Sequence, residues 1–318
     1  MNTPNVTVVL PCHGSLPYMK ETIDSLIHQS FSNFEVIVVN DRIATEYLDY
    51  VHGLNRIDSR IKVVNSQGIG ISAALNTGIE LSTSNLIARI DADDVMDICR
   101  IETQFSSISK NEAVLCVGSQ LKIVDELGHL KRYSNYPESS GQIRSMMKIR
   151  NVVAHPSVMF RKDAILKVGA YRSFFDGSED YDLWLRLIDF GDIINLHEPL
   201  TVYRTHLSQE TRRNRESQLE MDSLTRIFAV SASNIPESSA GENLKSMVID
   251  TKLITSDFLK KSTLSVQDKI SLTSAHYLNA AMAELTLANL AKSIYVMAIR
   301  PKLFLLALKY TFSRWLHV

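Results

Sequence analysis

The 318-residue chain is short of the features that mark several protein classes. Its three cysteines, Cys12, Cys99 and Cys116, are an odd number without a close pair or metal-type spacing, which argues against a disulfide framework or a zinc site. No stretch approaches the roughly 20 apolar residues of a membrane span, and no export signal is apparent. A formal net charge of −1 gives no overall attraction to nucleic acid. We therefore expect a cytoplasmic globular protein that binds no nucleic acid.

The first half of the chain alternates strand-like and helix-like segments. Short apolar runs predict strands at 6–10, 35–39, 61–65 and 86–90. Amphipathic segments predict helices at 17–29, 45–54 and 71–81. Alternation of this kind is typical of the α/β class, with a mostly parallel sheet and helices on both faces. Right-handed crossovers then bring the strand-end loops 11–15, 40–41, 66–70 and 91–94 to one edge.

The second half is less regular. Between about 113 and 205 we expect strands at 114–124, 157–160, 193–196 and 201–203 and a helix at 180–190. After about residue 207 the pattern becomes helical.

The acidic end of the fourth expected strand is the most informative segment. Asp91 and Asp93 fall on the same side of an extended backbone, and Asp94 follows them. Carboxylates held together repel one another unless a cation lies between them. Their oxygens suit Mg²⁺ or Mn²⁺, which often complete their shells with substrate phosphates. The alternative is a polar capping turn before a helix that begins near Asp97.

Other strand-end loops carry candidate nucleotide contacts. Asp41 could accept a hydrogen bond from N3–H of a uracil ring, although it could equally be an ordinary turn residue. The glycine-rich segment 68–78 could bring a helix N-terminus to an anionic group, or it could serve only tight packing of helix on sheet.

A second acidic cluster lies at a loop-to-helix junction. Glu179, Asp180 and Asp182 occur together there, and an ionised carboxylate at this place could accept a proton from a sugar hydroxyl. The alternative is that these acids only complement the helix dipole. His206 follows a strand and could add an imidazole to the metal, although a lone histidine is more often structural and hard metals prefer oxygen.

Together these segments resemble family 2 of the glycosyltransferases, which have the GT-A fold, over about residues 5–206. The resemblance is carried by four short segments in order: Gly70-Ile-Ser-Ala-Ala-Leu-Asn-Thr-Gly78, Ile87-Ala-Arg-Ile-Asp-Ala-Asp-Asp94, His155-Pro-Ser-Val-Met-Phe160 and Glu179-Asp-Tyr-Asp-Leu-Trp-Leu-Arg186.

The resemblance implies a metal-dependent, inverting transfer of one sugar from a UDP-sugar to a glycan or lipid-linked acceptor, in the synthesis of O-antigen, capsule or lipopolysaccharide. The implied roles are a catalytic base at Asp180, acceptor contacts at Glu179, Trp184 and His155, nucleotide contacts at Pro11, His13, Asp41, Gly68, Asn76 and Asp91, and ligands for Mn²⁺ or Mg²⁺ at Asp93, Asp91 and His206.

Two positions depart from the family's common pattern. Asn40-Asp41-Arg42-Ile43 stands where Asp-Asp-Gly-Ser is frequent, so the loop after Asp41 must differ. Leu75 stands where many members carry a phosphate-facing arginine, which would make neutralisation of the diphosphate depend more on the metal. The Gln-x-x-Arg-Trp segment of processive members is absent, so a single addition is expected.

We expect a catalytic domain at 1–206, with a nucleotide half at about 1–96 and an acceptor half at about 97–206, and a helical region at 207–318. The segment 300–318 is basic, apolar and edged with aromatic residues. Such a helix could bind the inner face of an anionic membrane, or it could pack on the catalytic domain.

Two rival functions stay open. One is a catalytically inactive sugar-nucleotide-binding or scaffold protein of the same fold, against which the acids Asp91, Asp93 and Asp180 argue. The other is a sugar-nucleotide transferase, which would normally need a glycine-rich, basic triphosphate loop where 11–15 has none.

Overall fold

The computed structural model describes residues 3–147, 150–206, 222 and 225. The chain divides into two units, Met1–Arg212 and Arg213–Val318, and the described helices and strands belong to the first. The predicted helical region 207–318, with its membrane-facing segment 300–318, lies outside the described residues except for 222 and 225, and its structure stays a prediction.

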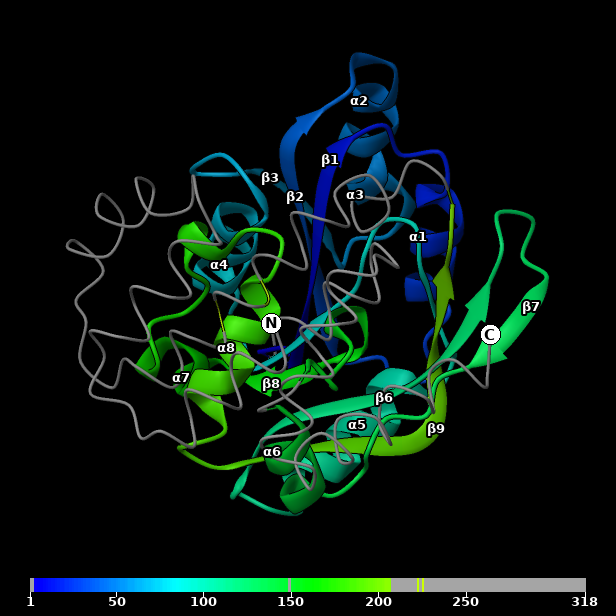
Figure 1. The fold of residues 1–318 in the computed structure, drawn as a ribbon. Helices are drawn as coiled ribbons and strands as arrows, with labels where there is room; N and C mark the ends of the chain where they lie inside the picture. The colour runs from blue at the N-terminus through cyan, green and yellow to red at the C-terminus, as the bar shows by residue number, and fades with distance from the viewer. Residues whose placement is uncertain (1–2, 148–149, 207–221, 223–224, 226–318) are drawn as a thin grey trace, which may run out of the picture. The chain divides into compact units, whose positions relative to one another are not determined.

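The N-terminal half contains four parallel strands, as predicted. β1 (Val6–Gly14), β2 (Phe34–Ile43), β3 (Ile61–Asn65) and β4 (Leu86–Arg89) lie in the order β3-β2-β1-β4. The helices between them are α1 (Met19–Ile27), α2 (Thr45–His52), α3 (Leu54–Ile57) and α4 (Ile71–Leu81), and α1 and α4 lie on opposite sides of the strands (Figure 1). Because the four strands are parallel, the loops after them meet at one edge of the sheet.

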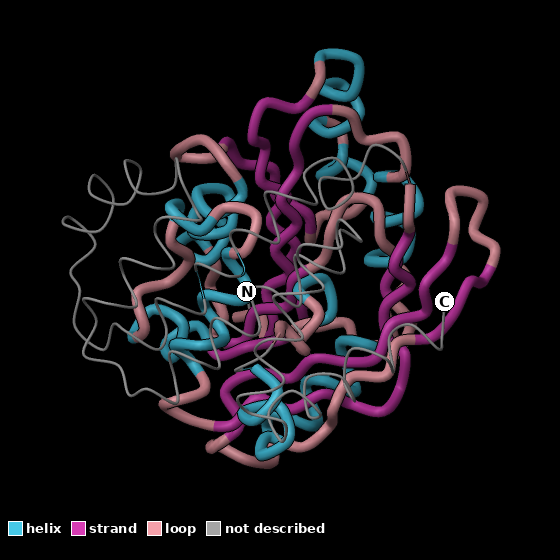
Figure 2. Tube along the Cα trace, in the orientation of Figure 1, coloured by secondary structure: helices cyan, strands magenta, loops and turns pink. Residues whose placement is uncertain are grey.

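The rest of the sheet is mixed. Beyond β4 the order continues through β8 (Met159–Arg161), β6 (Val114–Val124) and β9 (Asp192–Arg204) to β5 (Val95–Met96), while β7 (Leu130–Tyr133) pairs with β6. Only β6 and β9 pair in parallel here; the other pairings are antiparallel. The helices of this half are α5 (Arg100–Ser109), α6 (Ser140–Met147), α7 (Lys162–Lys167), α8 (Glu179–Leu187) and the short 3₁₀ turns η1 (His155–Ser157) and η2 (Ser173–Phe175) (Figure 2).

The expectation of two separate strands at 193–196 and 201–203 is wrong, because both belong to β9. Pairing with β6 continues through register shifts around Gln120, which faces Pro199. A proline is tolerated at such an irregularity because it removes a ladder donor where pairing is already interrupted. The expected strand at 157–160 also begins later, since Ser157 belongs to η1.

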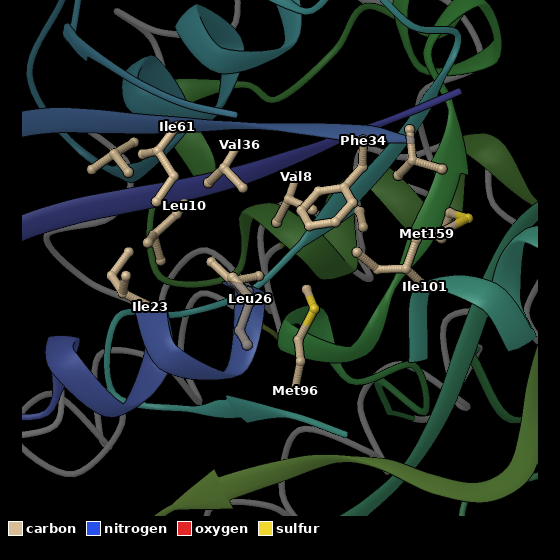
Figure 3. Close-up of a cluster of buried hydrophobic side chains, with 14 of the residues drawn as sticks. Val8, Leu10, Ile23, Leu26, Phe34, Val36, Ile61, Met96, Ile101 and Met159 are labelled. Carbon is tan, nitrogen blue, oxygen red and sulfur yellow. The ribbon is translucent and has the colours of Figure 1, made fainter. Parts of the chain in front are cut away.

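The two faces of the sheet are buried by alternate residues of the same strands. Along β1, Val8 and Leu10 pack with α1 and its neighbours, whereas Val9 packs with α4 on the other face. Figure 3 shows Val8 and Leu10 in the cluster of buried side chains that also contains Ile23 and Leu26 of α1. Burying one such side chain contributes about 1.5–3 kcal/mol, so this alternation fixes the register of the strands, because a slip of one residue would exchange the two faces.

Within the part of the chain that the structure describes, no helix is both long and apolar enough to cross a membrane.

Candidate active site

Asp91 follows β4 at the functional edge and is held by Arg89. The Arg89 guanidinium donates through Nη1 to Asp91 Oδ2 at 2.6 Å, and its Nη2 lies 2.5 Å from Oδ1. Burial raises the pKa of Asp91, Arg89 opposes that rise, and the charge of Asp93 adds to it. A paired carboxylate of this kind is fixed in orientation.

Asp93 and His206 meet although they are 113 residues apart. His206 Nε2 lies 2.8 Å from Asp93 Oδ2, so the structure brings together two of the residues expected at the metal. Arg204 helps to hold this loop, since its Nε donates to the backbone carbonyl of Asp93 at 3.3 Å. Arg204 also pairs with Glu21.

Asp94 is the most deeply buried acid of the cluster. Its Oδ1 accepts the backbone N–H of Arg204 at 3.0 Å, whereas its buried Oδ2 has no hydrogen-bond partner among the described residues. Burial raises the pKa of Asp94 well above its usual range, and the charges of Asp93 and Asp91 add to the rise. Ligand oxygens of Asp91, Asp93 and Asp94 lie within 4.8 Å of one another. An unpartnered buried oxygen within such a cluster fits a hard divalent cation.

Arg100 ties the strand before this cluster to η1. Its side chain is fully buried, and its Nη groups donate to the backbone carbonyls of Arg89 and Pro156, both at 2.7 Å. Burial lowers the pKa of Arg100 to about 9. The guanidinium thereby fixes the end of β4 against the turn that carries His155.

A hollow of about 440 Å³ lies beside the ends of β2 and β3. Asp41 and Gly68 line it, together with other residues of the same two loops: Asn40, Arg42, Asn65, Ser66, Gln67 and Ile69. Asp41 Oδ2 accepts the backbone N–H of Gly70 at 3.0 Å. His13 Nδ1 lies 2.7 Å from the backbone carbonyl of Asp41, and the His13 side chain is exposed.

Two other expected nucleotide contacts have internal roles in this structure. Pro11 is buried in β1 opposite Val39. Asn76 on α4 uses both ends of its amide on the backbone of Tyr171, through an Nδ2 bond at 2.8 Å and an Oδ1 bond at 3.0 Å. Asn76 therefore ties α4 to the loop before α8, and its contact with a nucleotide stays a prediction.

The second cluster joins His155, Glu179 and Asp180, whose ligand atoms lie within 4.8 Å of one another. His155 Nδ1 lies 3.4 Å from Glu179 Oε1, and Glu179 Oε2 accepts the backbone N–H of Gly177 at 2.7 Å. Asp180 is half-buried, and its Oδ2 accepts a hydrogen bond from Asn151 Nδ2 at 2.8 Å. The cluster thus presents one partly accessible carboxylate beside an orienting amide.

His155 is a neutral, buried imidazole. Burial and the nearby charge of Arg89 lower the pKa of His155 to about 3. Its Nε2 lies 2.9 Å from the hydroxyl of Tyr171, and its ring packs edge-on against Trp184 with centroids 6.1 Å apart. Trp184 is completely buried, so it supports the cluster from the core, and its position does not favour the expected direct contact with an acceptor.

The two acidic clusters adjoin, because Arg100 donates both to the carbonyl of Arg89, two residues before Asp91, and to the carbonyl of Pro156, next to His155. Burial is the main reason that the pKa of Glu179 is raised, and the charge of Asp91 adds to the rise. The same charge acts on His155 and opposes the lowering of its pKa. The arrangement can hold a cation and a diphosphate on one side and a proton-accepting carboxylate on the other.

Five contributors were not among the residues expected from the sequence. Arg89 and Arg204 could have been found, because each lies two residues before an expected site residue, Asp91 or His206, at the end of a strand. Nothing in the local sequence points to Arg100, Asn151 or Tyr171, which reach the site through long-range packing.

Comparison with known sequences identifies the family. Residues 7–169 match Glycosyl transferase family 2. The chain is 33% identical over 205 residues to the O-antigen biosynthesis glycosyltransferase WbnJ of Escherichia coli, covering 63% of this chain and 80% of the relative. It is 30% identical over 198 residues to the amylovoran biosynthesis glycosyltransferase AmsE of Erwinia amylovora, covering 61% and 73%.

Solved structures share the fold at low identity. TarS 1-349 of S. aureus, crystallised with UDP-GlcNAc, matches with a TM-score of 0.58 and 14% identity over 92% of this chain and 89% of that chain. The chain spans 54% of a longer TarS chain. The mannosyltransferase PcManGT of Pyrobaculum calidifontis, in complex with GDP-Man and Mn²⁺, matches with a TM-score of 0.56 and 14% identity over 96% and 86%. These neighbours confirm the predicted GT-A fold, and by the family match this chain belongs to glycosyltransferase family 2.

Proposed function

We propose that the protein transfers a single sugar, with inversion, from a UDP-sugar to a glycan or lipid-linked acceptor in the synthesis of a surface polysaccharide. The observation that carries this proposal is the adjacency of the two acidic clusters, around Asp93 and Asp180, which Arg100 ties together through the backbone carbonyls of Arg89 and Pro156. The O-antigen and amylovoran roles named for the relatives WbnJ and AmsE support the choice of pathway class.

The nucleotide of the donor would occupy the hollow that Asp41 lines. Asp41 offers a carboxylate acceptor whose orientation is set by the Gly70 N–H. TarS binds UDP-GlcNAc and PcManGT binds GDP-Man, so these neighbours support a sugar nucleotide in general, and the choice of uridine rests on Asp41 as acceptor for the uracil N3–H.

Asp93, Asp91 and His206 would hold Mn²⁺ or Mg²⁺ beside the diphosphate. The unpartnered Oδ2 of Asp94 and the 2.8 Å approach of His206 to Asp93 support a cation at this place, as does the Mn²⁺ in the PcManGT complex. A bound cation would supply Lewis-acid stabilisation of the departing diphosphate. The Arg89 guanidinium fixes the orientation of the Asp91 carboxylate, which would preorganise it for this task.

Asp180 would accept the proton of the acceptor hydroxyl as that oxygen attacks the anomeric carbon. Its partial exposure and the Asn151 amide behind it support this role, because a base must be both accessible and oriented. The attack and the departure of the diphosphate occur on opposite faces of the sugar, which inverts the anomeric centre. Glu179 and His155 would line the acceptor side.

Calorimetric titration with UDP, GDP and dTDP, each with and without Mn²⁺, tests the donor site. We expect Mn²⁺-dependent binding of UDP that Asp93→Ala abolishes and that Asp163→Ala, an exposed aspartate on α7, leaves unchanged. Absence of metal-dependent binding to any of the three nucleotides would contradict the proposal. Nucleotide binding without release of UDP from any UDP-sugar, in the presence of lipid-linked acceptor extracts, would favour the inactive scaffold.

A further inference from the structure

Arg42 is the extra residue of a β-bulge at the carboxyl end of β2. In the ladder between β1 and β2, His13 faces Asp41 and Gly14 faces Ile43, which leaves Arg42 without a partner. The φ angle of Arg42 is 59°, in the left-handed region that residues other than glycine seldom adopt. Bulges near functional sites commonly redirect a side chain.

Side chains and backbone around the bulge hold this conformation. The Ile43 N–H donates to Asn40 Oδ1 at 2.9 Å, and the Ala44 N–H donates to the Gly14 carbonyl at 2.8 Å. The protein therefore keeps an arginine where the backbone favours glycine. A strained residue that the surroundings enforce in this way is a reason to look for a function.

The side chain of Arg42 lies on the rim of the hollow that Asp41 lines. Its Nε donates to Asp41 Oδ1 at 3.0 Å, and its side chain is 57% exposed while that of Asp41 is 6% exposed. Its Nη groups make no hydrogen bond to any of the described residues. Arg42 thus anchors one N–H on the acceptor and keeps further donors for a molecule in the hollow.

A donor fixed beside an acceptor complements a ring N–H that stands next to a carbonyl oxygen. Uracil has this arrangement at N3–H and its flanking oxygens. Cytosine has a lone pair at N3 and an amino group beside it. Its N3 would face Asp41 acceptor to acceptor, and its amino group would face Arg42 donor to donor. Because the Asp41 side chain is only 6% exposed, water could do little to relieve its carboxylate of a second acceptor, which disfavours cytosine.

We propose that Arg42 is a specificity-determining residue of the nucleotide site: its guanidinium donates to a carbonyl oxygen of uracil while Asp41 accepts the ring N3–H. This inference rests on the proposed function, because it requires a uridine nucleotide in the hollow.

Titration of UDP, CDP and GDP in the presence of Mn²⁺ tests the inference on the wild type, Arg42→Gly, Arg42→Lys and Ala170→Gly. Ala170 is the matched backbone control, because it also has a positive φ, of 51°, and it does not line the hollow. We expect the wild type to prefer UDP over CDP. Arg42→Gly should weaken UDP binding by about 10- to 100-fold, the usual effect of losing a charge-assisted hydrogen bond, and should change CDP binding little.

Loss of folding should not account for weaker UDP binding by Arg42→Gly. Arg42→Gly relieves the left-handed backbone, so we expect a melting temperature at or above that of the wild type. Arg42→Lys should recover part of the affinity at most, since an ammonium cannot hold Asp41 and the base with a planar fork. Ala170→Gly should bind UDP as the wild type does.

Two results would overturn the inference while the proposed function stands. They are unchanged UDP binding by Arg42→Gly, and equal weakening of UDP and CDP, which would place Arg42 on the shared ribose or diphosphate. A wild-type preference for GDP over UDP would overturn the UDP-sugar donor of the proposed function, and this inference with it. A wild type that binds none of the three nucleotides would instead overturn the proposed function, and this inference with it.

Discussion

The carboxylate of Asp176 caps the N-terminus of α4 by accepting the backbone N–H of Ser72 at 3.3 Å across 104 residues of chain. The helix has glycine at its own N-cap, Gly70, and so has no side-chain cap from its own segment. Burial raises the pKa of Asp176, Ser72 opposes that rise, and the charges of Glu179 and Asp41 add to it. Asp176 therefore joins the glycine-rich turn of the nucleotide side to the loop that leads into Glu179.

Removal of this cap should destabilise the catalytic unit. We expect Asp176→Ala to lower the free energy of unfolding by about 1 kcal/mol, the usual value for a lost N-cap. For a unit of this size the melting temperature should fall by roughly 2–4 °C. Asp49→Ala, an exposed aspartate within α2, is the control and should change stability by less than about 0.5 kcal/mol. If Asp176→Ala and Asp49→Ala lower the melting temperature equally, the bond from Asp176 to the N-terminus of α4 does not stabilise the protein.

Stability should also fall at acidic pH through Glu35. Burial alone would raise the pKa of Glu35, but hydrogen bonds from Lys62, Thr83 and Thr7 outweigh it and lower the pKa from 4.5 to about 2. A lowered pKa stabilises the fold fully above 4.5, and this contribution disappears as the pH falls from 4.5 toward 2. Because Lys62 is more than half exposed, we expect about 2 kcal/mol rather than the full value of the shift.

Urea unfolding between pH 7 and pH 2.5 measures the Glu35 contribution. Glu35→Gln should be less stable than the wild type at pH 7, and the difference should shrink as the pH falls through the window. A constant difference between the two proteins across that range would contradict the assignment.

Much of the nucleotide half could be predicted from the sequence, because its strands are buried on both faces and its helices are amphipathic. The bounds expected for β3, α4 and β6 agree with the structure. β9 could not be predicted as one strand, since Pro199 and the exposed residues before it resemble a turn and only pairing with β6 shows the continuity. Local pattern carries no information about such a partner.

The same limit applies to the candidate site. Strand period predicted that Asp91 and Asp93 would lie on one side of an extended backbone, but β4 ends at Arg89. A turn, in which the Asp94 N–H donates to the Asp91 carbonyl at 3.3 Å, brings the acids together instead. The approach of the four loops followed from parallel strands. The contact of His206 with Asp93 spans 113 residues, and that of Asn151 with Asp180 spans 29 residues without any motif. The left-handed conformation of Arg42 depends on the β1–β2 register, which composition does not reveal.

The pair of Arg89 and Asp91 should be energetically coupled. Arg89 is buried, so Arg89→Met leaves Asp91 without its bidentate partner and should cost about 2–4 kcal/mol, somewhat less than for a fully buried pair because Asp91 is 31% exposed. The double variant Arg89→Met/Asp91→Leu should recover at least about 1 kcal/mol of that loss. Additive losses in urea unfolding of the single and double variants would contradict the coupling.

Asp180 and Asn151 should separate chemistry from donor binding. Because the proposed role of Asp180 is to accept a proton from the acceptor hydroxyl alone, Asp180→Asn should lower kcat by about 10²- to 10⁴-fold and leave the affinity for UDP unchanged. Asn151→Ala keeps the carboxylate but removes the amide that bonds Asp180 Oδ2 at 2.8 Å, so we expect a smaller fall in kcat with the same UDP affinity. Asp189→Asn, an exposed aspartate just beyond α8, is the control and should keep both quantities. Steady-state rates of UDP release and calorimetric affinities for UDP, measured on each variant, distinguish these cases. Loss of UDP affinity in Asp180→Asn would show that Asp180 contacts the donor and would contradict its role as the base.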